Sequence, residues 1–164
     1  MQETIKKMTR SASIGLFGSI GAALIVIIFY YASPYRFYIS NNAANYLFYG
    51  GVALAVLVIA MALMTVRKKP RQIRTIDDIN ERITNYAAMV RSLYSTTFAT
   101  NVILSVIILL CHNNALLMFV IITVLLQFMT YPNMYKVKVD AGLTHEQMHE
   151  IYGDAYSEPT KDNE

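Results

Sequence analysis

The stretch IGLFGSIGAALIVIIFYY, residues 14–31, decides the fold because it contains no carboxylate, ammonium, guanidinium or imidazole side chain. An α-helix of about 19 residues is roughly 28 Å long, close to the roughly 30 Å hydrocarbon layer of a membrane. Three further apolar blocks follow, at about residues 45–66, 92–110 and 115–131. The sequence therefore predicts an all-α membrane protein, with four transmembrane helices in an antiparallel bundle.

The overall composition agrees with this interpretation. Of the 164 residues, 55% are hydrophobic and 15% are charged, whereas a soluble domain is about 45–50% apolar and about 25% charged. The spans and their connections take up nearly all of the length, so we expect one membrane domain over residues 1–135 and a tail over residues 136–164. A single cysteine, Cys111, excludes an internal disulfide and a four-thiolate metal site. We expect no cofactor.

The first apolar block follows Lys6, Lys7 and Arg10, as in a cleaved signal peptide. The block is longer than the usual apolar region of about 7–15 residues. It is followed by YYASPYR, residues 30–36, with Pro34 and bulky aromatic residues where small residues would mark a cleavage site. We interpret the block as an uncleaved first span.

Basic residues are distributed asymmetrically around the spans. Of the 14 basic residues, only Arg36 falls between the first two spans, and the others flank the opposite ends of the spans. Because basic loops remain in the cytoplasm, we predict an inner-membrane protein with both termini cytoplasmic. A basic run beside a span is typical of contact with anionic lipid headgroups, and it does not favour nucleic-acid binding. The predicted lipid-contacting residues are Arg67, Lys68, Lys69, Arg71 and Arg74.

Nine Phe or Tyr residues lie between Phe29 and Tyr49, around the connection between the first two spans. They predict an aromatic belt at the outer membrane interface, or alternatively a cap that binds a ligand or a partner. The turn CHNN, residues 111–114, is very short, so the third and fourth spans are expected to be antiparallel neighbours. This register places Gln127 at a depth near Thr97.

Residues from about 76 to 91 predict an amphipathic helix that continues into the third span. Thr75 is a suitable N-cap, and Asp77 and Asp78 in the first turn would complement the helix dipole. The apolar residues recur every three or four positions on one stripe, Ile76, Ile79, Ile83, Ala87, Val90 and Tyr94. We expect the stripe to bury against the cytoplasmic tail, the membrane surface or a second subunit.

Small residues and uncharged polar residues lie inside the predicted spans. The small ones predict close helix contacts, either within the bundle or in a homodimer. They are Gly15, Gly18, Ser19 and Ala22 in the first span, and Gly51 and Ala55 in the second. The polar ones predict interhelical hydrogen bonds or a path for a polar substrate. They are Thr97, Thr100, Asn101, Thr123 and Gln127. We favour hydrogen bonds, because no charged residue lies at mid-membrane, where proton-coupled transport needs one.

The tail contains HEQMH, residues 145–149, which matches the H-E-x-x-H pattern of zinc proteases. A catalytic zinc needs a third protein ligand, and His112 is predicted on the opposite side of the membrane. The remaining candidates are acidic residues near the C-terminus, Asp154, Glu158, Asp162 and Glu164. We therefore expect no metal site at His145 and His149. We expect a short amphipathic helix over about residues 145–152, with Thr144 as its cap, after an extended connector YKVKVD, residues 135–140.

These features favour a non-enzymatic scaffold or accessory subunit of a membrane, which associates with itself or with another membrane protein. The alternative is a small oligomeric transporter or channel whose path lies between the third and fourth spans. A zinc metalloprotease is the remote third hypothesis.

Overall fold

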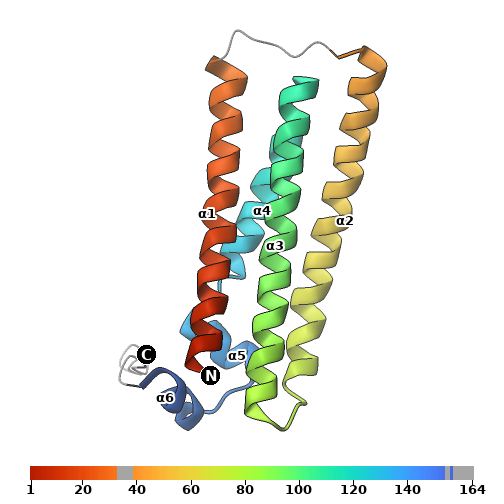
Figure 1. Ribbon diagram of the computed structural model, residues 1–164. Helices are drawn as coiled ribbons and strands as arrows, with labels where there is room; N and C mark the ends of the chain where they lie inside the picture. The colour runs from red at the N-terminus through yellow and green to blue at the C-terminus, as the bar shows by residue number, and fades with distance from the viewer. Residues whose placement is uncertain (33–38, 154–155, 157–164) are drawn as a thin grey trace, which may run out of the picture.

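The computed structural model describes residues 1–32, 39–153 and 156, and these residues form helices and turns without a β-strand (Figure 1). The long helices are α1 (Gln2–Ala32), α2 (Asn41–Ile73) and α3 (Ile79–Cys111). A short 3-10 helix, η1 (Asn114–Leu116), leads into α4 (Leu117–Met129), and two short helices follow, α5 (Met134–Ala141) and α6 (His145–Tyr152).

Helices α1, α2 and α3 are each long and apolar enough to cross a membrane. The fourth apolar block differs, because η1 and α4 meet the same criterion only together with α5, from which they are bent by 81°. The chain is therefore an all-helical, multi-pass membrane protein. Its length and composition give three spans, or four if the bent pair counts as one.

The helices extend well beyond the predicted spans. Helix α1 begins at Gln2, and α2 continues through the basic run to Ile73 with Pro70 inside it. The apolar blocks mark only the parts that match the hydrocarbon layer, whereas a helix ends where its backbone hydrogen bonds end. The third apolar block and the amphipathic segment before it form one helix, α3.

The N-cap of α3 is Asp78, so the predicted cap at Thr75 is wrong. The Asp78 side chain accepts a hydrogen bond from the Asn80 backbone N–H at 3.1 Å. Thr75 instead lies in the α2–α3 turn, where its hydroxyl donates to the Gln72 carbonyl at 2.8 Å. An aspartate oxygen is a good acceptor for a free N–H of the first turn, and its charge suits that end of the helix.

Helix α3 occupies the centre of the molecule, between α1 and α2, and α4 packs against α1 and α3 (Figure 1). Glycines permit the close approach of α1 to α3. A Cβ atom on Gly15 would lie 3.1 Å from Tyr94 Cβ, and one on Gly18 would lie 2.7 Å from Phe98 Cε2. The start of α1, the α2–α3 turn, α5 and α6 all lie at the same end of the bundle (Figure 1).

The predicted extended connector over residues 135–140 is wrong, since these residues belong to helix α5. Pro132 lies in the break after α4, and Asn133 then caps the new helix by accepting from the Lys136 N–H at 2.7 Å. At the other end Gly142 adopts a left-handed conformation with φ of 64°. This pair of end signals, with Val137 and Ala141 buried one turn apart, favours a helix.

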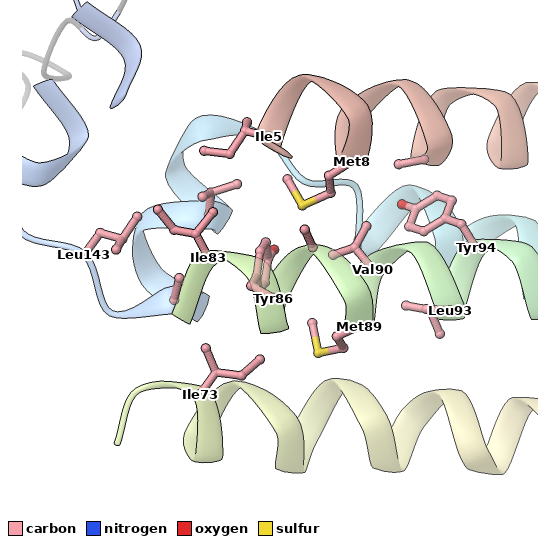
Figure 2. Packing of buried hydrophobic residues seen from close by; sticks show 14 of the residues in the cluster. Ile5, Met8, Ile73, Ile83, Tyr86, Met89, Val90, Leu93, Tyr94 and Leu143 are labelled. Atoms are coloured by element: carbon pink, nitrogen blue, oxygen red, sulfur yellow. The ribbon is translucent and has the colours of Figure 1, made fainter. Parts of the chain in front are cut away.

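The buried stripe of α3 packs into a cluster at the end of the bundle that holds α5 and α6, which we call the terminal cluster. In Figure 2 Tyr86, Val90 and Tyr94 of α3 point toward α1, whereas Met89 points toward α2. The rest of the cluster comes mainly from the start of α1 and from the tail, including Ile5, Met8, Val137, Leu143, Met148 and Ile151. Of the three expected partners of the stripe, the tail thus contributes directly, and α1 is an additional partner that the sequence did not indicate.

Candidate functional site

Four of the predicted polar residues pair across α3 and α4 in two rungs, which we call the polar ladder. Gln127 Nε2 donates to Thr97 Oγ1 at 2.6 Å, and Thr123 Oγ1 lies 2.5 Å from Asn101 Oδ1. Residues 97 and 101 are one turn apart on α3, as 123 and 127 are on α4, so the rungs are stacked. All four side chains are at most 1% exposed.

The ladder hydroxyls also bond to their own helices. Thr97 Oγ1 donates to the Leu93 carbonyl at 2.8 Å, whereas the one proton of the Thr123 hydroxyl is within reach of two acceptors, Asn101 Oδ1 and the Val120 carbonyl at 2.8 Å. A hydroxyl has one proton and can also accept. In the Thr97 rung the proton therefore goes to the backbone, and the hydroxyl oxygen receives the Gln127 amide. The fifth predicted polar residue, Thr100, donates to the Thr96 carbonyl and is outside the ladder.

Several buried polar atoms near the ladder have no protein partner in the part of the chain that the structure describes. They are Ser19 Oγ, Asn101 Nδ2, Ser105 Oγ and Gln127 Oε1. An unpaired buried polar group costs about 1–3 kcal/mol relative to a paired one. The ladder is therefore a contact with remaining hydrogen-bonding capacity, not a fully satisfied network.

Tyr94 adds an interaction that sequence reasoning missed. Its hydroxyl donates to the Gln127 carbonyl at 2.5 Å, which ties the last turn of α4 to α3. Nearby, Ser13 Oγ of α1 lies 2.8 Å from the Tyr131 hydroxyl, just beyond α4. A tyrosine in an apolar helix is a weak signal for such a bond, because its hydroxyl needs a partner when buried.

The small residues of α1 and α2 contact α3 and its neighbours within one chain. Gly15 and Gly18 face Tyr94 and Phe98, as described above, while a Cβ atom on Gly51 would lie 3.2 Å from Leu116 Cδ1 and 3.3 Å from Ile107 Cδ1. The other members are Ser19 and Ala55, which are buried, and Ala22, which is partly exposed. These faces are thus occupied inside the chain.

The predicted lipid-contacting residues lie at the end of α2, where all five are exposed: Arg67, Lys68, Lys69, Arg71 and Arg74. The ion pairs of residues 1–32, 39–153 and 156 are Lys7–Glu3 and Lys136–Asp140, so none of these five pairs with a carboxylate there. Two cavities of about 490 and 130 Å³ lie between α2 and α3 and share Lys69 and Ser92 among their lining residues. We call them together the α2–α3 groove.

Arg82 joins the α2–α3 turn to the tail. Its Nε and Nη2 atoms donate to the Ile76 carbonyl at 2.9 and 2.7 Å, and its Nη1 atom donates to the Gly142 carbonyl at 2.9 Å. All three bonds go to backbone oxygens. This role of Arg82 could not be inferred from the sequence, because main-chain acceptors leave no side-chain signature.

The tail forms the predicted helix with the predicted cap. Thr144 Oγ1 accepts from the Gln147 N–H at 3.3 Å, and the Gln147 side chain accepts from the Thr144 N–H at 2.9 Å. The rings of His145 and His149 are 5.4 Å apart, and the ring of Tyr156 lies 5.1 and 5.9 Å from them. Burial raises the pKa of the Tyr152 phenol at the end of this helix.

Metal-binding geometry is not found in the described part of the chain, where no three His, Cys, Asp or Glu side chains could hold an ion together. The Lys138 ammonium donates to the Tyr156 hydroxyl at 2.9 Å, which places a cation beside the two histidines. The acidic candidates for a third ligand lie outside the described residues: Asp154, Glu158, Asp162 and Glu164.

At the other end of the bundle His112 stacks on Tyr30, with ring centroids 4.6 Å apart, and the Tyr30 hydroxyl donates to the His112 carbonyl at 3.3 Å. His112 has φ of 49° as the C-cap of α3, which allows the tight turn into η1. Part of the predicted aromatic belt or cap, Tyr35, Phe37 and Tyr38, lies outside the described residues.

Comparisons of the chain with protein-family models, with curated proteins and with solved structures found no match. Function is therefore inferred from the bundle itself. Its two distinctive features are the polar ladder between α3 and α4 and the α2–α3 groove beside the basic end of α2.

Proposed function

We propose that the protein is a non-enzymatic scaffold or accessory subunit of an assembly in the inner membrane. The observation that carries this proposal is the pairing within the polar ladder. Thr97, Asn101, Thr123 and Gln127 hydrogen-bond to one another across α3 and α4, as residues do that hold helices together in lipid. The α2–α3 groove reaches only Thr97 of this set.

We further propose that the chain crosses the membrane four times, with both termini in the cytoplasm. The basic end of α2, the α2–α3 turn and helices α5 and α6 share one end of the bundle (Figure 1). Basic segments remain on the cytoplasmic side, which orients this end. The fourth span would consist of η1 and α4, with the 81° bend placing α5 at the membrane surface.

A scaffold needs a surface for its partner, and the outer faces of the long helices offer several. Large apolar side chains are exposed on α1, α2 and α4, for example Phe17 at 68%, Leu57 at 54% and Phe128 at 65%. Lipid can cover all of these faces. A protein partner, which includes a second copy of this chain, would cover one of them.

The second candidate function is a small oligomeric transporter or channel. It is favoured by the buried amide atoms of Asn101 and Gln127 that have no protein partner, since a polar path needs free hydrogen-bonding groups. It is disfavoured by the absence of charged residues beside them at mid-depth of α3 and α4.

Site-specific photo-crosslinking in intact cells tests the scaffold proposal. A photoreactive phenylalanine analogue replaces Phe17, Leu57 or Phe128, one at a time, in the full-length chain. The scaffold proposal expects a discrete protein adduct from one face, while the other positions, which serve as matched controls, give none. If all three positions give no protein adduct, the proposal is wrong.

Cysteine labelling tests the orientation separately. In a Cys111→Ser background, Asn114→Cys should react with an impermeant maleimide added outside, and Asp77→Cys only after the membrane is opened. Both residues are exposed, so access depends on the side of the membrane. The reverse pattern would contradict the proposed topology.

A further inference from the structure

The α2–α3 groove has polar and apolar lining residues in both of its parts, and Lys69 is the cationic residue that lines it. Its larger part, about 490 Å³, is lined by four polar residues, Lys69, Gln72, Asn85 and Ser92, and by four apolar ones, Ile73, Ile76, Ala88 and Met89. Its smaller part, about 130 Å³, continues between the helices. Its lining includes four apolar residues, Val58, Met61, Ala62 and Leu93, and three threonines, Thr65, Thr96 and Thr97. The residues that line the two parts include no carboxylate.

Lys69 lies where the two parts meet and has no ion-pair or hydrogen-bond partner among the described residues. Arg67, Lys68 and Arg71 are its close neighbours on the same helix end and add positive charge. An anion at this junction would therefore meet an unopposed ammonium group. The charge of the groove is complementary to a phosphate group.

The position of the groove matches one leaflet of a membrane. Lys69 follows the second apolar block and Ser92 begins the third, so both lie at the predicted edge of the hydrocarbon layer. From Lys69 to Val58 the groove follows α2 over roughly 16 Å, at 1.5 Å per residue. One leaflet of a roughly 30 Å hydrocarbon layer has a similar depth of about 15 Å.

We propose that the α2–α3 groove binds one anionic glycerophospholipid of the cytoplasmic leaflet. The phosphate lies at Lys69, where Ser92 and Asn85 can donate hydrogen bonds, and one acyl chain lies beside Val58 and Met61. This inference rests on the proposed orientation, which places this end of the bundle at the cytoplasmic leaflet. It goes beyond a general attraction of the basic run for lipid, because it assigns one lipid to one groove.

The occupant is a lipid rather than a soluble anion because the phosphate position continues directly into the smaller part of the groove, toward Met61 and Val58 in the predicted second span. A soluble anion would leave Met61, which is 44% exposed, without a partner molecule, whereas an acyl chain covers it.

Native mass spectrometry of the purified full-length protein in detergent measures the first bound lipid directly. Phosphatidylglycerol is the anionic probe and phosphatidylcholine the probe without net charge. Lys69→Gln should weaken the binding of the first phosphatidylglycerol molecule about fivefold, which is the usual effect of one basic residue beside an anionic headgroup. Lys68→Gln is the matched control, because it removes the same charge from the same exposed helix end outside the groove.

A second variant partly fills the groove without changing its charge. Ala88 is exposed and lines the larger part, so Ala88→Trp should occupy part of that space and weaken the first, tightest binding event. Equal losses in Lys69→Gln and Lys68→Gln, or unchanged binding in Ala88→Trp, would overturn the proposal in favour of diffuse surface attraction. Displacement of the lipid by inorganic phosphate would also overturn it.

Failure of this proposal can be told apart from failure of the proposed function. Lipid affinity in detergent does not depend on orientation or on a protein partner. The cysteine labelling and the photo-crosslinking, in contrast, do not depend on Lys69. A groove that binds no lipid in a correctly oriented, partner-bound protein would therefore refute only the lipid site.

Discussion

The rung between Thr97 and Gln127 allows a quantitative test of whether the polar ladder is a dry contact. In the unchanged protein Gln127 Nε2 donates to Thr97 Oγ1 at 2.6 Å. Thr97→Val keeps the shape of the side chain but leaves Gln127 Nε2 without this acceptor. In a dry site an unpaired amide N–H costs about 1–3 kcal/mol. We therefore expect Thr97→Val to lower the free energy of unfolding by an amount in that range.

The reverse change has a different expected result. Gln127→Leu removes the donor together with Gln127 Oε1, which is buried without a protein partner in the described structure. The loss of one interhelical bond, about 0.6 kcal/mol on average in membrane proteins, is offset by the removal of the unpaired oxygen. Gln127→Leu should therefore be close to neutral or slightly stabilising.

A double-mutant cycle combines the two changes. In the Gln127→Leu background Thr97→Val no longer leaves an unpaired amide, so its cost should fall and give a coupling energy of about 1–2 kcal/mol. Thr97→Ser is the control, because it keeps the hydroxyl and loses only one methyl group. Unfolding is followed by tyrosine fluorescence in micelles with increasing dodecyl sulfate, since the chain has 12 Tyr and no Trp.

The outcome also separates the two candidate functions. If Thr97→Val has no cost and the coupling energy is near zero, water replaces the lost hydroxyl, and the reasoning for a dry ladder is refuted. That result would favour the transporter or channel. A cost within the expected range favours the structural role.

Two further changes test the close contacts of the fold. Gly18→Ala should destabilise the protein by about 1–3 kcal/mol, because the added methyl group would lie 2.7 Å from the facing phenylalanine ring. The loss is measured as a lower thermal unfolding midpoint in detergent. Gly21→Ala is the control and should not lower the midpoint, because a Cβ atom on Gly21 would meet nothing within 4 Å. Equal destabilisation by the two changes would contradict the close contact at Gly18. Gly142→Ala should destabilise the tail by about 1–2 kcal/mol because φ is 64°, as measured by proteolysis after α5. Gly142→Asn should be milder, and equal cleavage of both variants would argue against backbone strain.

The helical class and the approximate positions of the long helices could be predicted from the sequence, because apolar blocks of sufficient length have few alternatives in lipid. Helix ends could not be predicted in the same way. Hydropathy does not report where backbone hydrogen bonds end, so α1 begins at Gln2, well before the first apolar block. Helix α5 was missed because apolar residues alternate with polar ones over residues 135–141, as in an extended strand, and because its end signals, Asn133 and Gly142, lie outside the segment.

The candidate site was partly predictable. The short turn after α3 fixes an antiparallel register, and Gln127 lies opposite Thr97, where that register places it. The role of Arg82 could not be predicted, since its acceptors are main-chain carbonyls, one of them 60 residues away. The α2–α3 groove depends on the space between two helices, which a sequence pattern does not describe.

The terminal cluster joins α1 to α6, because Ile5 and Met8 of α1 share it with Met148 and Ile151 of α6. This arrangement has a consequence for biosynthesis. The spans can insert as they leave the ribosome, but the cluster is complete only when α6 has been translated. Until then Met8 and Tyr86 lack the apolar neighbours that the tail supplies, so a nascent or prematurely terminated chain offers chaperones and quality-control proteases a hydrophobic surface that the finished protein conceals.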